Sequence, residues 1–152
     1  MNRYVNTIFC DDIRHEVGNK FSYMGVYSVD MFVPGFPVVL PKLCLALKVA
    51  TPYSNPFRKL TLRILKDKEI IAEGNLDEKE LANFVESIND AATEENGIRF
   101  HMFQSTFIFS PFQLDAPCTL RVRVETEEGE IRGPGLRIKQ VPSNAEQSSS
   151  AV

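Results

Sequence analysis

The stretch that decides the fold is TLRVRVE, residues 119–125, in which apolar and charged side chains alternate without a break. The apolar members are Leu120, Val122 and Val124, and the charged members are Arg121, Arg123 and Glu125. Because successive side chains of a β-strand point to opposite faces, this pattern predicts a strand with one buried and one hydrated face. The same alternation in LCLALKV (43–49) and LTLRI (60–64) predicts two more strands of this kind.

Similar runs along the whole chain predict about eight strands. They are expected at 3–11, 20–33, 42–51, 58–66, 69–75, 98–110, 117–126 and 130–140. Turn-forming pairs such as Gly18-Asn19 and Glu128-Gly129 separate them. Many short strands joined in this way are typical of a sandwich or a barrel, and we predict an all-β antiparallel β-sandwich of about seven to nine strands.

One segment departs from the strand pattern. DEKELANFVESINDAA, residues 77–92, carries apolar residues at helical spacing, namely Leu81, Phe84, Val85, Ile88 and Ala92. Asp77 and Glu80 are placed as in a capping box, which favours a helix start. We therefore expect one amphipathic helix between the fifth and sixth strands. Its apolar stripe is expected to seal an open end or edge of the sandwich, the alternative being that it docks onto a partner.

Length and composition indicate one domain. The chain has 152 residues, of which 43% are hydrophobic and 24% charged, as in ordinary globular proteins. We expect a domain over 1–141 and a disordered tail over 142–152, because PSNAEQSSSAV has no apolar pattern. The sequence shows neither a signal peptide nor an apolar run long enough to cross a membrane. We expect a cytoplasmic protein without a transmembrane segment.

The charges are unevenly distributed. The net charge is −3, but residues 67–95 hold ten acidic and two basic residues, a net of −8, so the remainder carries +5. The basic residues of that remainder are scattered rather than clustered, and binding many phosphates needs a concentrated positive field. We therefore expect no nucleic-acid partner.

The heptapeptide CDDIRHE, residues 10–16, is the most conspicuous group of potential ligands. Asp12, His15 and Glu16 are the candidates for a metal site, although motifs such as HExxH are absent. We expect instead that the first strand ends near here, that these polar side chains bond the turn or pair with Arg14, and that Cys10 is a small buried hydrophobe. The three cysteines, Cys10, Cys44 and Cys118, lack metal or disulfide spacing. No cofactor and no catalytic residue is predicted.

The aromatic residues divide into two groups. Phe103, Phe107 and Phe109 share one face of a strand with Ser105, and the phenylalanines are expected to supply most of the core volume. Phe36, Tyr53 and Phe57 lie in or beside proline-rich connections and are candidates for an interaction surface. Arg63, Arg121 and Arg123 join them as a basic patch if their strands are neighbours.

From FCDDIRHEVGNKFSYMGVYSVDMFVPGFPVVLPKLCLALKVATPYSNPF, residues 9–57, the chain resembles a group of small bacterial proteins. That group opens with a similar CDD-R-E---K-S--G-Y run, followed by LP-L and TP---P. It is functionally uncharacterised, and the resemblance implies an immunoglobulin-like or C2-like β-sandwich in a bacterial cytoplasm. The resemblance brings no activity, cofactor or catalytic residue.

These patterns favour a non-enzymatic binding or assembly module. Its loops or a sheet edge would contact another protein or a second copy of the chain. Two alternatives stay open. One is a metal-dependent enzyme that uses Asp12, His15 and Glu16, and the other is a sandwich that binds sugars or a membrane surface through its loop aromatics.

Overall fold

The chain is mostly β-structure, as predicted, and a computed structural model describes residues 2–89 and 100–142. The described part contains eleven strands and one helix. They are β1 (Tyr4–Glu16), β2 (Lys20–Tyr27), β3 (Asp30–Val33), β4 (Val38–Leu40), β5 (Leu43–Pro52), β6 (Leu60–Lys66), β7 (Glu69–Leu76), α1 (Glu78–Asn89), β8 (Phe100–Phe109), β9 (Phe112–Leu114), β10 (Cys118–Thr126) and β11 (Gly129–Gln140).

The strand number differs from the predicted seven to nine for two reasons. The single strand expected over 20–33 is interrupted at Ser28-Val29, which gives β2 and β3. The short strands β4 and β9 pair with each other, and three residues are too few for an alternating pattern to be recognised.

The strands form three sheets. One has four strands in the order β2-β1-β5-β8, one has five in the order β3-β11-β10-β6-β7, and the third is the pair β4-β9. All neighbours are antiparallel except β3 and β11, which run parallel, so the prediction of a purely antiparallel sheet system is wrong at this edge. The chain passes from the first sheet to the second between β2 and β3, and β3 enters beside β11 in the same direction.

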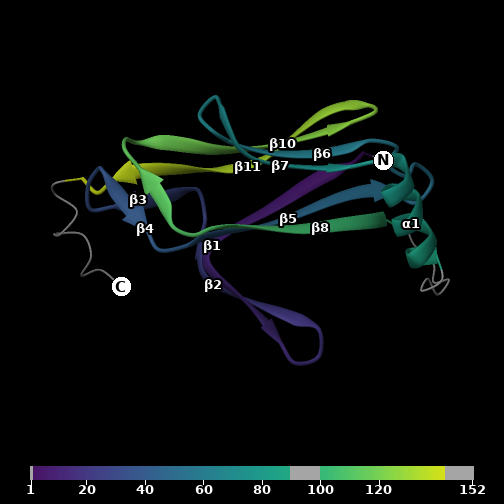
Figure 1. Cartoon of the computed structure of the whole chain (residues 1–152), viewed down its shortest axis with the longest axis horizontal. Helices are drawn as coiled ribbons and strands as arrows, with labels where there is room; N and C mark the ends of the chain where they lie inside the picture. Colours follow the sequence, from purple (N-terminus) through teal and green to yellow (C-terminus); the bar gives the residue numbers. More distant parts are fainter. Residues whose placement is uncertain (1, 90–99, 143–152) are drawn as a thin grey trace.

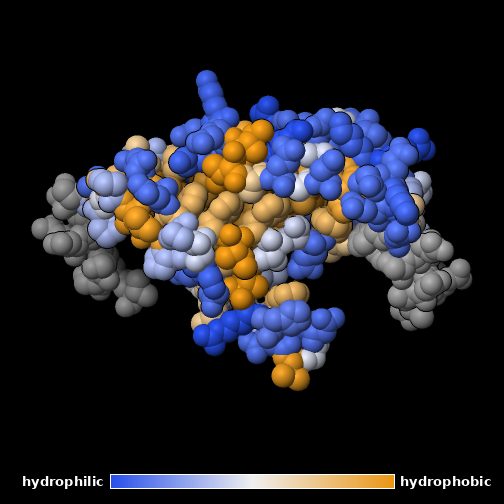
Figure 2. Space-filling model, in the orientation of Figure 1, coloured by the Kyte–Doolittle hydropathy of each residue, from blue (hydrophilic) through white to orange (hydrophobic). Residues whose placement is uncertain are grey.

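The two larger sheets lie as two layers, and their buried side chains belong to one hydrophobic core (Figure 1). β5 contributes Leu45 and Leu47 from one layer, and β10 contributes Leu120 and Val122 from the other. The alternation read from residues 119–125 is therefore confirmed. Figure 2 shows a band of hydrophobic side chains between the layers.

The core is richer in leucine than in phenylalanine, which corrects the expectation that phenylalanines dominate it. Among the described residues, the large side chains with almost no exposure are leucine, isoleucine and valine together with His101. Phe103, Phe107 and Phe109 do pack against the core from one face of β8, as predicted, but they are only partly buried. β8 is the edge strand of its sheet, and no other described strand pairs with its free edge.

Helix α1 begins with the predicted capping box. The backbone N–H of Glu80 donates to Asp77 Oδ1 (2.8 Å), and the backbone N–H of Asp77 donates to Glu80 Oε2 (3.2 Å). Leu81 is buried in the core, and α1 lies at the end of the molecule where β1 begins (Figure 1). The rest of the predicted stripe lies outside the described side chains, namely Phe84, Val85, Ile88 and Ala92.

The predicted tail lies almost wholly outside the described residues, because these end at Pro142. Within the ranges 2–89 and 100–142, no helix is both long enough and apolar enough to cross a membrane.

Candidate interaction site on the first hairpin

The heptapeptide CDDIRHE is part of a strand, which corrects the prediction of a polar connection after residue 11. β1 continues through it to Glu16 and pairs with β2 in a continuous antiparallel register, from Asp12 opposite Met24 to Glu16 opposite Lys20. Gly18 and Asn19 close the hairpin with positive φ angles of 89° and 58°.

The two halves of β1 have different surroundings. Within the described residues, 4–10 pair with β5, whereas 12–16 pair with β2 alone. The end of β1 and the beginning of β2 therefore leave the sheet together as a two-stranded extension, which points away from both layers (Figure 1). We call residues 11–25 the arm.

Asp11 and Gly25 shape the root of the arm. Gly25 has a φ of +67°, and a Cβ atom built on it would lie 2.1 Å from Asp11 Oδ2. Only glycine leaves room for this carboxylate, which also accepts a hydrogen bond from the hydroxyl of Tyr27. Burial and this bond raise the pKa of Tyr27. The arm thus departs from the sheet through a defined contact.

One face of the arm is largely aromatic. Ile13 lies opposite Tyr23 and His15 opposite Phe21, so the four side chains share a face. The rings of His15 and Phe21 have centroids 4.7 Å apart. Phe21 remains 42% exposed, and Val17 at the tip is 95% exposed. Nothing within the described chain covers these apolar surfaces fully.

The opposite face of the arm carries charged side chains. The predicted metal ligands are divided between the two faces. Asp12 and Glu16 lie on this face with Arg14, whereas His15 lies on the aromatic face. Lys42 Nζ is 3.0 Å from Asp12 Oδ1 and lowers the pKa of Asp12, while Arg14 Nε is 3.8 Å from Asp12 Oδ2. Among the residues that the structure describes, no group of three or more His, Cys, Asp or Glu side chains is placed to hold a metal ion.

An apolar row crosses the outer face of the four-stranded sheet at the root of the arm. It consists of Val26, Cys10, Cys44 and Ile108, each directly opposite the next. Both cysteines are fully buried, as predicted for Cys10, and burial is the main cause that raises the pKa of Cys10 to about 11. Val26 and Ile108 at the two ends of the row are exposed.

The three loop aromatics predicted as binding residues contact other residues of the chain. Phe57 is only 6% exposed, and the guanidinium carbon of Arg3 lies 4.6 Å from its ring centre. Tyr53 stacks on the buried His101 with ring centroids 4.1 Å apart, and burial lowers the pKa of this histidine. Phe36 is half-buried and packs against the core.

The three arginines predicted as a basic patch lie on the outer face of the five-stranded sheet. Arg63 and Arg123 are directly opposite each other on β6 and β10. Carboxylates accompany them: Arg63 bonds Glu73 (3.0 Å) and Glu125 (2.7 Å), and Arg123 lies 3.6 Å from Glu130, while Arg121 is exposed further along β10. This surface is a network of mixed charge.

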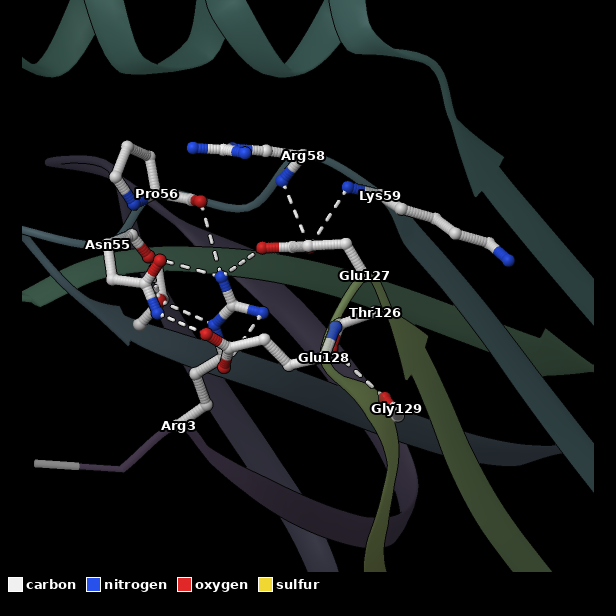
Figure 3. A network of polar contacts seen from close by, with 10 residues as sticks. Arg3, Asn55, Pro56, Arg58, Lys59, Thr126, Glu127, Glu128 and Gly129 are labelled. Atoms are coloured by element: carbon white, nitrogen blue, oxygen red, sulfur yellow. Dashed lines mark hydrogen bonds and ion pairs between the residues drawn. The ribbon is translucent and has the colours of Figure 1, made fainter.

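Sequence reasoning missed an anchor at the beginning of β1, centred on Arg3 (Figure 3). The Arg3 side chain is only 4% exposed and pairs with Glu127. It also donates from Nε to Thr51 Oγ1 (2.8 Å) and from Nη2 to the carbonyl oxygens of Asn55 and Pro56 (3.2 Å each). These partners lie far from Arg3 in sequence, so no local sequence motif predicts the contacts.

Glu127 completes this anchor. Its carboxylate accepts hydrogen bonds from the backbone N–H groups of Arg58 (3.1 Å) and Lys59 (3.2 Å) as well as from Arg3. Burial opposes the ionisation of Glu127, but these bonds outweigh it and lower its pKa to about 2. A polar pocket of about 330 Å³ lies beside Arg3 and is lined also by Asn55 and Glu128.

Comparison with known proteins places the chain in a family. It belongs to the family of unknown function DUF6941, whose model matches residues 6–139. No curated protein and no solved structure matches the chain.

Proposed function

We propose that this member of the DUF6941 family is a non-enzymatic protein-binding module and that the arm is its contact element. The observation that supports this most is the exposed aromatic face on a two-stranded extension that the rest of the sheet does not cover. Isolated two-stranded hairpins are at best marginally stable in water. Binding of a partner over the arm would therefore pack its apolar side chains and order its two strands.

The partner is an extended segment of another protein that adds a strand to the free edge of β2. β2 is the last strand of its sheet, and an edge strand offers unpaired N–H and C=O groups. Natural edges are usually protected by charge or proline, but KFSYMGVY (20–27) contains only Lys20 as a charged residue and no proline. Apolar side chains of the added strand would pack beside Phe21 and Tyr23.

The charge of the arm favours protein over nucleic acid. Asp11, Asp12 and Glu16 contribute −3 and Arg14 and Lys20 contribute +2, so the arm carries a net charge of −1. A phosphate backbone gains little from such a surface, because binding it depends on releasing counterions to basic side chains.

We also propose a fold type and a cellular location for this module. The two layers with one core are interpreted as a β-sandwich of the immunoglobulin-like or C2-like kind, in which strand edges and end loops are the usual binding surfaces. The resemblance to bacterial proteins supports a bacterial cytoplasm as the place where the module works.

The test compares three baits in affinity capture from the source cell. They are the natural chain, the arm variant Phe21→Lys with Met24→Lys, and the control variant Phe32→Lys with Val39→Lys, which also replaces two exposed apolar residues. Each captured protein is then purified and titrated against all three baits. Light scattering of the natural chain alone measures self-association.

We expect at least one purified protein to bind the natural chain and the control equally and to bind the arm variant at least about tenfold more weakly, a difference of about 1.4 kcal/mol. Equal binding to the arm variant, or equal loss in the control, contradicts the arm as contact element. A dimer that dissociates only in the arm variant would replace the foreign partner by a second copy.

A further inference from the structure

We propose that Cys10 and Cys44 are a modification site at which a peroxide forms a disulfide across β1 and β5. The two residues are directly opposite each other in the antiparallel pairing of these strands. Both are free thiols, and both are fully buried. The inference is independent of the proposed binding function.

The strand geometry suits a disulfide. Directly opposite residues in an antiparallel pair have Cα atoms about 4.5 to 5.5 Å apart, and disulfides span about 4.4 to 6.8 Å between Cα atoms. Opposite residues also point to the same face, so the two thiols lie side by side on the outer face of the four-stranded sheet. Cys118 lies on β10 in the other sheet.

The position at the root of the arm gives an oxidant a route to the buried sulfurs. Cys10 is the last residue of β1 that pairs with β5, and Cys44 is the second residue of β5. Local opening at the end of a strand pair costs less than opening in its middle. The Cys44 thiol lies 3.9 Å from the carbonyl oxygen of Asp11, so the same opening releases both thiols.

The chemistry consumes one peroxide for each disulfide. One thiol attacks an oxygen of hydrogen peroxide, and the O–O bond breaks. The products are a sulfenic acid on that cysteine and one molecule of water. The second thiol attacks that sulfur, the S–O bond breaks, and a second molecule of water leaves as the S–S bond forms. Because burial raises the pKa of both thiols, the reaction should be slower than that of an exposed thiolate.

The experiment treats the reduced, purified full chain with hydrogen peroxide and measures intact mass, followed by peptide mapping. We expect the native chain to lose the mass of two hydrogen atoms, the map to join Cys10 to Cys44, and dithiothreitol to reverse the change. Cys10→Ala and Cys44→Ala should each abolish the loss, whereas Cys118→Ala should keep it. Circular dichroism verifies that each variant is folded.

Three results would overturn the proposal. The first is an unchanged mass in the folded natural chain, and the second is a link that involves Cys118. The third is sulfinic or sulfonic acid on single cysteines without a link. If an alanine variant does not fold, the peptide map of the natural chain and of Cys118→Ala decides the question alone.

Discussion

The two ends of β1 lie in opposite environments. At the beginning of the strand, the buried Arg3 is bound by a carboxylate, a hydroxyl and two backbone carbonyls. At its other end, residues 11–16 have a described strand on one side only, and the arm to which they belong carries the exposed apolar residues Val17 and Phe21. One end is bound to two distant segments, 51–56 and the turn at Glu127, and the other extends into solvent.

The difference indicates which residues hold the fold and which are available for binding. A buried charge is costly unless it is fully paired, so the Arg3 anchor should tolerate little change. An exposed apolar side chain contributes little to folding, so its substitution should affect contacts with a partner rather than stability. The following variants test this division.

The largest effect is expected for Arg3→Ala. Removal of the guanidinium leaves Glu127 partly buried without its ionic partner and should lower the free energy of unfolding by about 3 kcal/mol. Urea unfolding followed by circular dichroism measures the change. Arg14→Ala is the matched control at the other end of β1, where the side chain is exposed, and should change stability by less than about 0.5 kcal/mol.

A second effect depends on pH. The pKa of Glu127 is about 2 in the folded chain, below its ordinary value of 4.5. The stabilisation is therefore complete above the ordinary pKa and is lost as the pH falls toward 2, which should amount to about 3 kcal/mol. Glu127→Gln should flatten the dependence of stability on pH in this window, and Glu128→Gln should not.

A third effect is expected at the root of the arm. Gly25→Ala places a Cβ against the Asp11 carboxylate in a left-handed backbone conformation and should cost about 1 to 2 kcal/mol. Gly74→Ala is the control, because a Cβ there meets no atom within 4 Å. Chemical shifts of the arm residues should change in Gly25→Ala and stay the same in Gly74→Ala.

The smallest effect on stability is expected for the arm variant Phe21→Lys with Met24→Lys. Both side chains are partly exposed, so the free energy of unfolding should change by less than about 0.5 kcal/mol while partner binding is lost. Thermal and urea unfolding measure this quantity. A loss comparable to that of Arg3→Ala would mean that the arm is structural.

The sequence predicts those strands that have one buried face. Alternation around Leu120 and Val122 identifies β10, because burial against the second layer selects apolar residues at every other position. In residues 11–16 no face is fully buried, so the alternation weakens and the sequence there favours a connection instead of a strand. The pairs Ile13 with His15 and Phe21 with Tyr23 do alternate, and they are the signal from which the aromatic face could have been found.

Contacts between distant segments were not predictable from local patterns. The Arg3 partners lie 48 or more residues away, and the parallel pairing of β3 with β11 joins Asp30 to Arg137, which are 107 residues apart. The positions of the helix and of most strands can be predicted from the local spacing of apolar residues. The contacts between distant segments depend instead on how the sheets are assembled.

The continuity of β1 also has a mechanical consequence. The same backbone runs from the Arg3 anchor to the tip of the arm, and its hydrogen bonds to β5 lie across the strand direction. A pull along the direction of residues 4–10 would therefore load these bonds in shear, all together, instead of peeling them apart one by one. We expect the hairpin to transmit tension into the sheet rather than to unzip from it.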